Sequence, residues 1–107
     1  MIPSPRTTLL GLVAASLSAF AAPAWADLAL AQKKNCMACH AVDRKIVGPS
    51  FKEVAAKYAK DNKAEAMLAD KIVKGGKGVW GEMAMPPNAN LSPAEAKALA
   101  KWVLAAK

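Results

Sequence analysis

The stretch Cys36-Met37-Ala38-Cys39-His40 constrains this chain more than any other part of its sequence. Two thiols separated by two residues and followed by an imidazole form the C-x-x-C-H pattern. Cysteines at positions i and i+3 lie on one side of a single turn, so both can form thioether bonds to the vinyl groups along one porphyrin edge. The adjacent His40 then lies where a ring nitrogen can bind iron. The motif therefore predicts one haem c, covalently bound through Cys36 and Cys39.

Three other roles for this cysteine pair fit the chain less well. A thioredoxin-like redox pair is expected within a βαβ pattern, and the sequence has no run typical of a strand. A structural zinc ion needs four protein ligands, but the chain contains two cysteines and one histidine. A disulfide that closes so short a loop would add little stability.

The first part of the sequence has the pattern of a secretory signal peptide. Arg6 precedes an apolar run from Leu9 to Ala22, and Ala24-Trp25-Ala26 supplies a small-x-small cleavage site. We expect residues 1–26 to be removed and residues 27–107 to form one mature domain. The alternative is an uncleaved membrane anchor, but the run is shorter than the roughly 20 residues that a membrane span needs. No stable membrane insertion is expected after cleavage.

Export and charge narrow the range of functions. A bacterial leader places the chain in the periplasm, the compartment in which C-x-x-C-H proteins receive their haem. The net charge is +7, and removal of Arg6 with the leader lowers it by one. No basic run with interleaved aromatic residues is present, so we expect no nucleic-acid partner. A domain this small usually needs a disulfide, a metal or a bound cofactor for stability. We therefore expect folding to depend on the haem.

Capping signals and hydrophobic periodicity predict an all-α domain. Two capping boxes pair a serine N-cap with a glutamate three residues later, Ser50 with Glu53 and Ser92 with Glu95. Asp61-Asn62 is expected to end the second helix and to cap the third. Strand-like alternation is absent. We expect about four helices wrapped around one covalently bound haem, at about residues 28–35, 50–60, 62–74 and 92–107.

The long loop between the third and fourth expected helices carries the candidates for the second iron ligand. His40 is the one histidine of the chain, so methionine is the remaining common ligand, and it raises the reduction potential. Met83 and Met85 both lie in this glycine-rich loop. Met85 is followed by Pro86-Pro87, whose fixed φ angles stiffen the backbone beside it. We predict His40 and Met85 as the iron ligands, with Met83 as the alternative to Met85.

Five short motifs make residues 27–107 resemble the short bacterial class I cytochromes c, within them the c-551/c-552 group. These motifs are Cys36-Met37-Ala38-Cys39-His40, Val47-Gly48-Pro49, Gly78-Val79-Trp80-Gly81, Met85-Pro86-Pro87-Asn88 and Ala100-Lys101-Trp102-Val103. The resemblance implies that the Pro49 carbonyl accepts the Nδ1–H of His40 and that Asn88 donates towards the Met85 sulfur. It also implies that Trp80, with Lys71, hydrogen-bonds a haem propionate.

The resemblance implies a monomeric periplasmic electron carrier. Its donor would be a membrane cytochrome complex, and its acceptor a terminal oxidase or a nitrite reductase. We expect no enzymatic activity, because the one histidine is a ligand and the carboxylates form no obvious pair. Two alternatives stay open. The first is a haem-c subunit held within a larger redox enzyme, and the second is a haem-based ligand sensor or weak peroxidase with an open iron site.

An electron carrier of this kind needs an exposed haem edge at which partners dock. We expect an apolar rim around that edge, formed by Met37, Ala38, Ile46, Val47, Met83, Ala84 and Pro86. We also expect lysines around the rim to attract acidic partners. The candidates are Lys34, Lys45, Lys74 and Lys77.

Overall fold

The computed structural model describes residues 2–5, 11 and 24–107. Within these residues the chain forms four α-helices, one 3-10 turn and no strand, which confirms the all-α prediction. The elements are α1 (Ala24–Lys33), η1 (Cys36–Ala38), α2 (Phe51–Lys57), α3 (Ala64–Lys74) and α4 (Pro93–Leu104). Most of the expected signal peptide lies outside the described residues. None of the described helices is long and apolar enough to cross a membrane.

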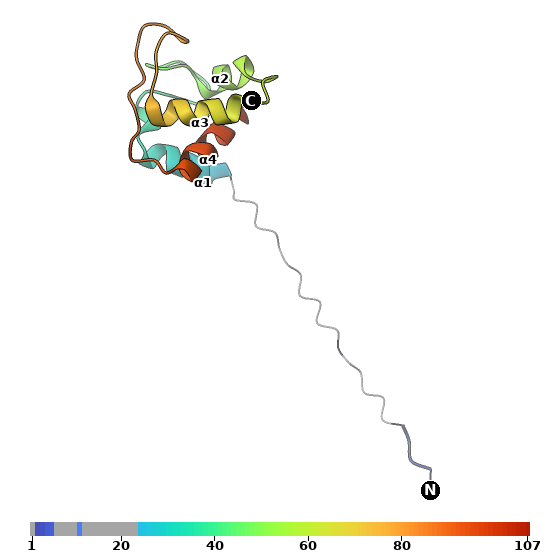
Figure 1. Ribbon diagram of the computed structural model, residues 1–107. Coiled ribbons are helices and arrows are strands. Elements are labelled where there is room, and N and C mark those ends of the chain that lie inside the picture. Colours follow the sequence, from blue (N-terminus) through green and yellow to red (C-terminus); the bar gives the residue numbers. More distant parts are fainter. Residues whose placement is uncertain (1, 6–10, 12–23) are drawn as a thin grey trace.

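Helix α4 is the central element of the fold. It packs against α1, α2 and α3, most extensively against α3 (Figure 1). Its buried residues Ala96, Leu99, Ala100 and Val103 recur at helical spacing and therefore form one face. Ala100 is fully buried, as is Ala31 of α1. The small side chains of this face leave room for neighbouring helices to pack closely.

The two capping boxes differ in completeness. At α4 the Ser92 hydroxyl accepts from the Glu95 N–H at 3.1 Å, and the Glu95 carboxylate accepts from the Ser92 N–H at 3.0 Å. Both bonds of the predicted box are therefore present. At α2 the Ser50 hydroxyl accepts from the Glu53 N–H at 3.1 Å, and this bond is the half of the box that forms.

Several helix ends differ from the prediction. Helix α1 begins at Ala24, so its first turn contains the expected cleavage site. It ends at Lys33, because the backbone turns to a left-handed conformation at Asn35, with φ 62°. The N-cap of α3 is Lys63, without a side-chain bond, whereas Asp61 accepts from the Lys63 N–H before the helix. Helix α4 ends at Leu104, short of the expected Lys107.

The hydrophobic core consists of two clusters. One contains Ala31, Leu91 and Leu99, and the other contains Phe51, Val54 and Val103. The same three partly buried side chains, Cys36, Met37 and Trp102, pack against both clusters. The first cysteine of the motif therefore lies where the two halves of the core meet.

Candidate functional site

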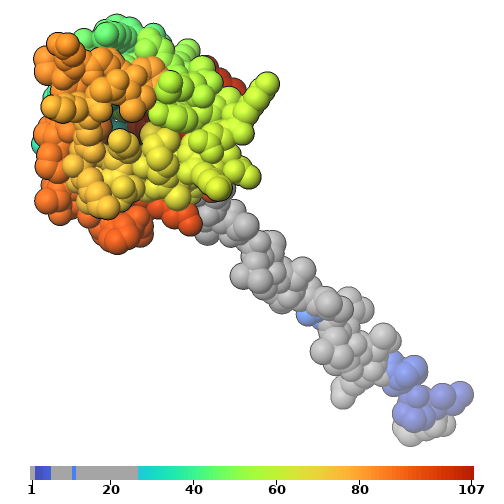
Figure 2. All heavy atoms as spheres, turned by 45° about the horizontal axis from the view of Figure 1, so that its top comes forward, coloured from blue at the N-terminus to red at the C-terminus, as the bar shows by residue number. Residues whose placement is uncertain are grey.

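A largely apolar cavity of about 180 Å³ separates the ligand-bearing loop from the helices. Its opening is visible between the orange loop segment and the green and yellow segments of α2 and α3 (Figure 2). Cys36, Cys39, His40 and Met85 all line this cavity. The structure thus brings together all four predicted site residues, from positions almost fifty residues apart in the sequence.

The two cysteines lie on and just after the turn η1. The Cys39 N–H donates to the Cys36 carbonyl at 3.2 Å, and the His40 N–H donates to the same carbonyl at 3.0 Å. Both thiols are free and half-buried. Burial raises the pKa of the Cys36 thiol, so the surroundings favour an uncharged sulfur. A thioether is an uncharged sulfur, and these surroundings suit it.

Three neighbours fix the His40 ring. The Nδ1 atom lies 2.8 Å from the Pro49 carbonyl oxygen. A carbonyl can only accept, so Nδ1 carries the proton and the neutral ring keeps its free lone pair on Nε2. The Phe51 ring stacks on the imidazole, with 5.2 Å between ring centroids. On Gly48 a Cβ atom would lie 2.5 Å from His40 Cε1, so this position requires a residue without a side chain.

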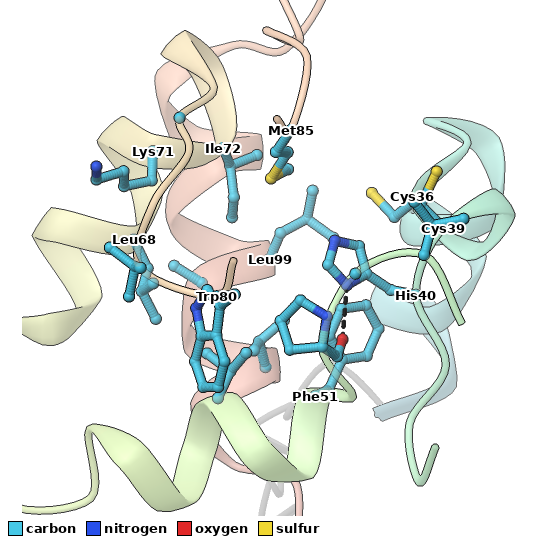
Figure 3. A pocket seen from close by; sticks show the side chains of 18 of the residues that line it. Cys36, Cys39, His40, Phe51, Leu68, Lys71, Ile72, Trp80, Met85 and Leu99 are labelled. Atoms are coloured by element: carbon cyan, nitrogen blue, oxygen red, sulfur yellow. Dashed lines mark hydrogen bonds between the residues drawn. The ribbon is translucent and has the colours of Figure 1, made fainter. Parts of the chain in front are cut away.

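Met85 is fixed through its backbone to Gly76, at the start of the loop. Its N–H donates to the Gly76 carbonyl at 2.8 Å, and its carbonyl accepts from the Gly76 N–H at 3.1 Å. Gly75 ends α3 with a φ of 74°, and a Cβ there would collide with the Met85 carbonyl and lie 2.9 Å from the Pro87 nitrogen. The Met85 sulfur points into the cavity, which His40 enters from the side of the cysteine motif (Figure 3).

Asn88 makes two hydrogen bonds to α3 that the sequence did not predict. Its side-chain amide donates to the Ile72 carbonyl at 2.8 Å, and its backbone N–H donates to the Val73 carbonyl at 2.9 Å. Both acceptors belong to α3, near the end of the helix. Asn88 therefore holds the far end of the loop against α3, and the bond from its amide to the Met85 sulfur stays a prediction.

Trp80 and Lys71 line the cavity, and Lys57 lies over the Trp80 ring outside that lining. Trp80 is 38% exposed, and its ring lies 5.5 Å from the Lys57 ammonium of α2. Lys71 of α3 also lines the cavity, close to Gly76. Sequence reasoning identified Trp80 and Lys71 through the resemblance, but it missed Lys57, because nothing in the sequence links that position to the loop. It also missed the close contacts that require glycine at positions 48 and 75.

The expected docking rim forms in part. Ile46, Val47 and Met83 are exposed, Met83 by 72%, and so are Ala38, Ala84 and Pro86. Val79, which was not predicted, is exposed as well. Met37 instead packs against both core clusters.

The four candidate lysines of the rim differ in their surroundings. Lys34 is tied down, because its ammonium donates to the Asn90 carbonyl at 3.0 Å and pairs with Glu95, leaving the side chain 13% exposed. Lys74 pairs with Asp70 at 2.9 Å. Lys77 lines the cavity, and Lys45 is exposed beside Ile46.

The donor set fits a haem c. Two thiols, an imidazole with a free Nε2 and a thioether surround one apolar cavity, and these are the groups such a cofactor requires. Among the described residues, no group of three or more His, Cys, Asp or Glu side chains could hold a metal ion directly. A zinc site at this motif therefore lacks its remaining ligands.

Comparisons with known proteins agree with this donor set. Residues 28–107 match the sequence model of the family described as cytochrome c. Cytochrome c-552 of Nitrosomonas europaea is 53% identical over 102 residues, covering 95% of this chain and 99% of that protein. Cytochrome c-551 of Pseudomonas aeruginosa is 55% identical over 86 residues, covering 78% of this chain and 82% of that protein. The crystal structure of wild-type N. europaea cytochrome c552 superimposes with a TM-score of 0.73 at 55% identity, covering 75% of this chain and 99% of that one.

Proposed function

This chain belongs to the cytochrome c family, and from that membership we propose that it is a one-electron carrier of the bacterial periplasm. Members of the family carry haem c, and Cys36 and Cys39 have the spacing of its attachment residues. His40 Nε2 and the Met85 sulfur would bind the iron. The observation that carries the proposal is that these four side chains converge on one apolar cavity.

Bound haem c would supply a one-electron couple, and the chain's own residues would hold His40 and Met85 in place in both redox states. The Pro49 carbonyl holds His40 in one tautomer. The two-way backbone bridge between Gly76 and Met85 fixes the sulfur-bearing residue next to α3. Apolar lining keeps water away from the ligands. A site held this firmly suits rapid electron transfer, because little has to move.

Export to the periplasm is supported by the lengths of the matched proteins. The curated N. europaea protein aligns with 95% of this chain, whereas the crystallised protein aligns with 75% and is itself covered to 99%. The part without a counterpart in the crystallised chain corresponds in size to the expected leader, residues 1–26. The family model likewise begins at residue 28. Mass spectrometry of the periplasmic protein should then find Asp27 as the first residue.

Partners would dock at the rim formed by Ile46, Val47, Val79 and Met83. Lys77 at the cavity and exposed Lys45 would attract acidic surfaces towards this rim. We propose a membrane cytochrome complex as electron donor and a terminal oxidase or nitrite reductase as acceptor, with the chain acting as a monomeric shuttle. In this role it has no catalytic activity of its own.

Visible absorption spectra of the oxidised and reduced holoprotein test the ligand assignment. We expect a low-spin c-type spectrum, with the weak far-red band of methionine bound to ferric iron. Met85→Ala should abolish this band, whereas Met83→Ala, in the same loop, should retain it. The reverse result would make Met83 the ligand. A high-spin spectrum in the unmutated protein would overturn the proposal in favour of a sensor or peroxidase with an open iron site.

A further inference from the structure

The outer part of the ligand loop, residues 77–84, has few polar contacts to the rest of the molecule. Among the described residues, its one backbone hydrogen bond joins the Gly78 N–H to the Gly81 carbonyl at 3.0 Å, within the segment itself. The bonds that anchor the loop lie at its two ends, at the Gly76–Met85 bridge and at Asn88. Contacts other than hydrogen bonds therefore have to hold residues 77–84 against the helices.

Lys57 makes such a contact. Its ammonium lies 5.5 Å from the centre of the Trp80 ring and 5.9 Å from the centre of the Tyr58 ring, within the range of cation–π attraction. Lys57 is the last residue of α2, and Trp80 lies in the middle of the segment. Trp80 lies just beyond the green α2 helix, at the edge of the cavity that Met85 enters (Figure 3).

We infer that Lys57 is a positioning residue that fastens the outer part of the ligand loop to α2 through the face of Trp80. The ammonium attracts two aromatic rings, that of Tyr58 just after α2 and that of Trp80 on the loop. It so bridges two segments that no hydrogen bond joins among the described residues. By limiting how often the segment opens, Lys57 slows access of solvent and small ligands to the side of the cavity where Met85 lies. The inference rests on the proposed function only for the identity of the ligand that is protected.

Amide hydrogen exchange of the holoprotein tests the inference without reference to iron ligation. An exposed cation–π contact is worth about 0.5–1 kcal/mol, so its loss should raise opening about two- to fivefold. We expect Lys57→Gln to accelerate exchange of the Gly78 N–H by this factor and to leave the Asn88 N–H unchanged. Lys52→Gln removes the same charge from an exposed position of the same helix and is the matched control. Lys57→Arg keeps a cation over the ring and should restore the slow exchange.

A second measurement connects the contact with the ligand. Cyanide displaces methionine from ferric haem, and the loss of the far-red band follows the reaction. Lys57→Gln should accelerate displacement about two- to fivefold, and Lys57→Arg should not. Equal exchange rates in Lys57→Gln and Lys52→Gln would overturn the role of Lys57 and leave the electron-carrier proposal intact. Accelerated exchange in a protein that lacks the far-red band would support the Lys57 contact and count against Met85 ligation.

Discussion

Gly48 shows how one missing side chain determines the orientation of a ligand. A Cβ at this position would lie 2.5 Å from His40 Cε1 and 2.9 Å from Nδ1, closer than real Cβ atoms come to other heavy atoms. Gly48 has no positive φ, so its backbone tolerates alanine, and the three nearest atoms to the added Cβ all belong to the imidazole. The ring could yield only by leaving the Pro49 carbonyl, which sets its tautomer.

We therefore expect Gly48→Ala to lower the free energy of unfolding of the holoprotein by about 1–3 kcal/mol, as overpacking commonly does. The low-spin spectrum should also weaken, because the imidazole is displaced. Denaturant titration and absorption spectra measure the two effects. Gly76→Ala is the matched control, because its Cβ would meet the mobile end of Lys71 at 3.2 Å and its φ is not positive either. Equal losses of unfolding free energy in Gly48→Ala and Gly76→Ala would contradict the proposed clash between a Cβ at position 48 and His40.

At the scale of elements, the start of α4 depends on the ionisation of Glu95. Acceptance of the Ser92 N–H lowers the pKa of the Glu95 carboxyl in the folded protein, and neighbouring Lys34 and Lys33 act in the same direction. Because the folded pKa lies below the unfolded one, the capping box stabilises the fold above the unfolded pKa. This contribution disappears as the pH falls through the folded pKa.

Glu95→Gln should accordingly destabilise the protein at neutral pH and have a smaller effect in acid, where Glu95 is protonated. Unfolding midpoints of the two proteins at neutral and acidic pH give the comparison. Glu53→Gln is a suitable control, since the corresponding carboxylate of α2 makes no reciprocal bond to Ser50. A difference between Glu95→Gln and the unmutated protein that stays constant down to acidic pH would show that the charge of Glu95 does not matter.

The elements that were predicted correctly from the sequence are those with short, local sequence signals. The Ser92–Glu95 box and the C-x-x-C-H turn are short patterns, and each is present. The start of α1 was wrong, because alanine-rich sequence favours helix without marking where it begins. The Asn88 bond to Ile72 and the Lys57–Trp80 contact join residues far apart in the chain, and no local pattern records such distances. The convergence of Cys36, Cys39, His40 and Met85 was predicted because each belongs to a motif.

At the scale of the whole molecule, the core and the cavity are one structure. Leu99, Phe51, Val54 and Val103 belong to the two core clusters and also line the cavity. Leu99 is the one large side chain among the described residues with less than 2% of its surface exposed. We therefore expect the core to be too small for stability without a large apolar group between its halves.

We expect the Cys36→Ala/Cys39→Ala double variant, which cannot attach haem, to lose much of its helical signal and its cooperative thermal transition. Circular dichroism of the variant and the holoprotein at the same concentration makes the comparison. Met37→Leu should lose less helical signal and less cooperativity, because Met37 packs against the same two clusters but its replacement leaves haem attachment intact. Full helicity and a cooperative melt in the double variant would show that the polypeptide core suffices.

The charge distribution leads to a prediction about how partners are recognised. The net charge of +7 over the whole chain falls by only one with the leader, and Lys77 lies at the cavity. The ferrous protein should therefore react with an anionic oxidant at a rate that falls as salt is added. Ferricyanide is such an oxidant, and a cationic cobalt complex should show the opposite trend. At physiological ionic strength charges act over only about 8 Å, so a lysine near the site of transfer should matter more than a distant one.

Lys77→Gln should therefore slow oxidation by ferricyanide and flatten its salt dependence more than Lys97→Gln, which removes the same charge from an exposed position of α4 outside the cavity lining. Stopped-flow rates over a series of salt concentrations separate the two variants. If both variants lower the oxidation rate and its salt dependence equally, the oxidant responds only to the net charge. The position of Lys77 at the cavity mouth would then not matter. If Lys77→Gln alone is affected, electrons leave through the rim of Ile46, Val47, Val79 and Met83, and acidic partners are recognised there.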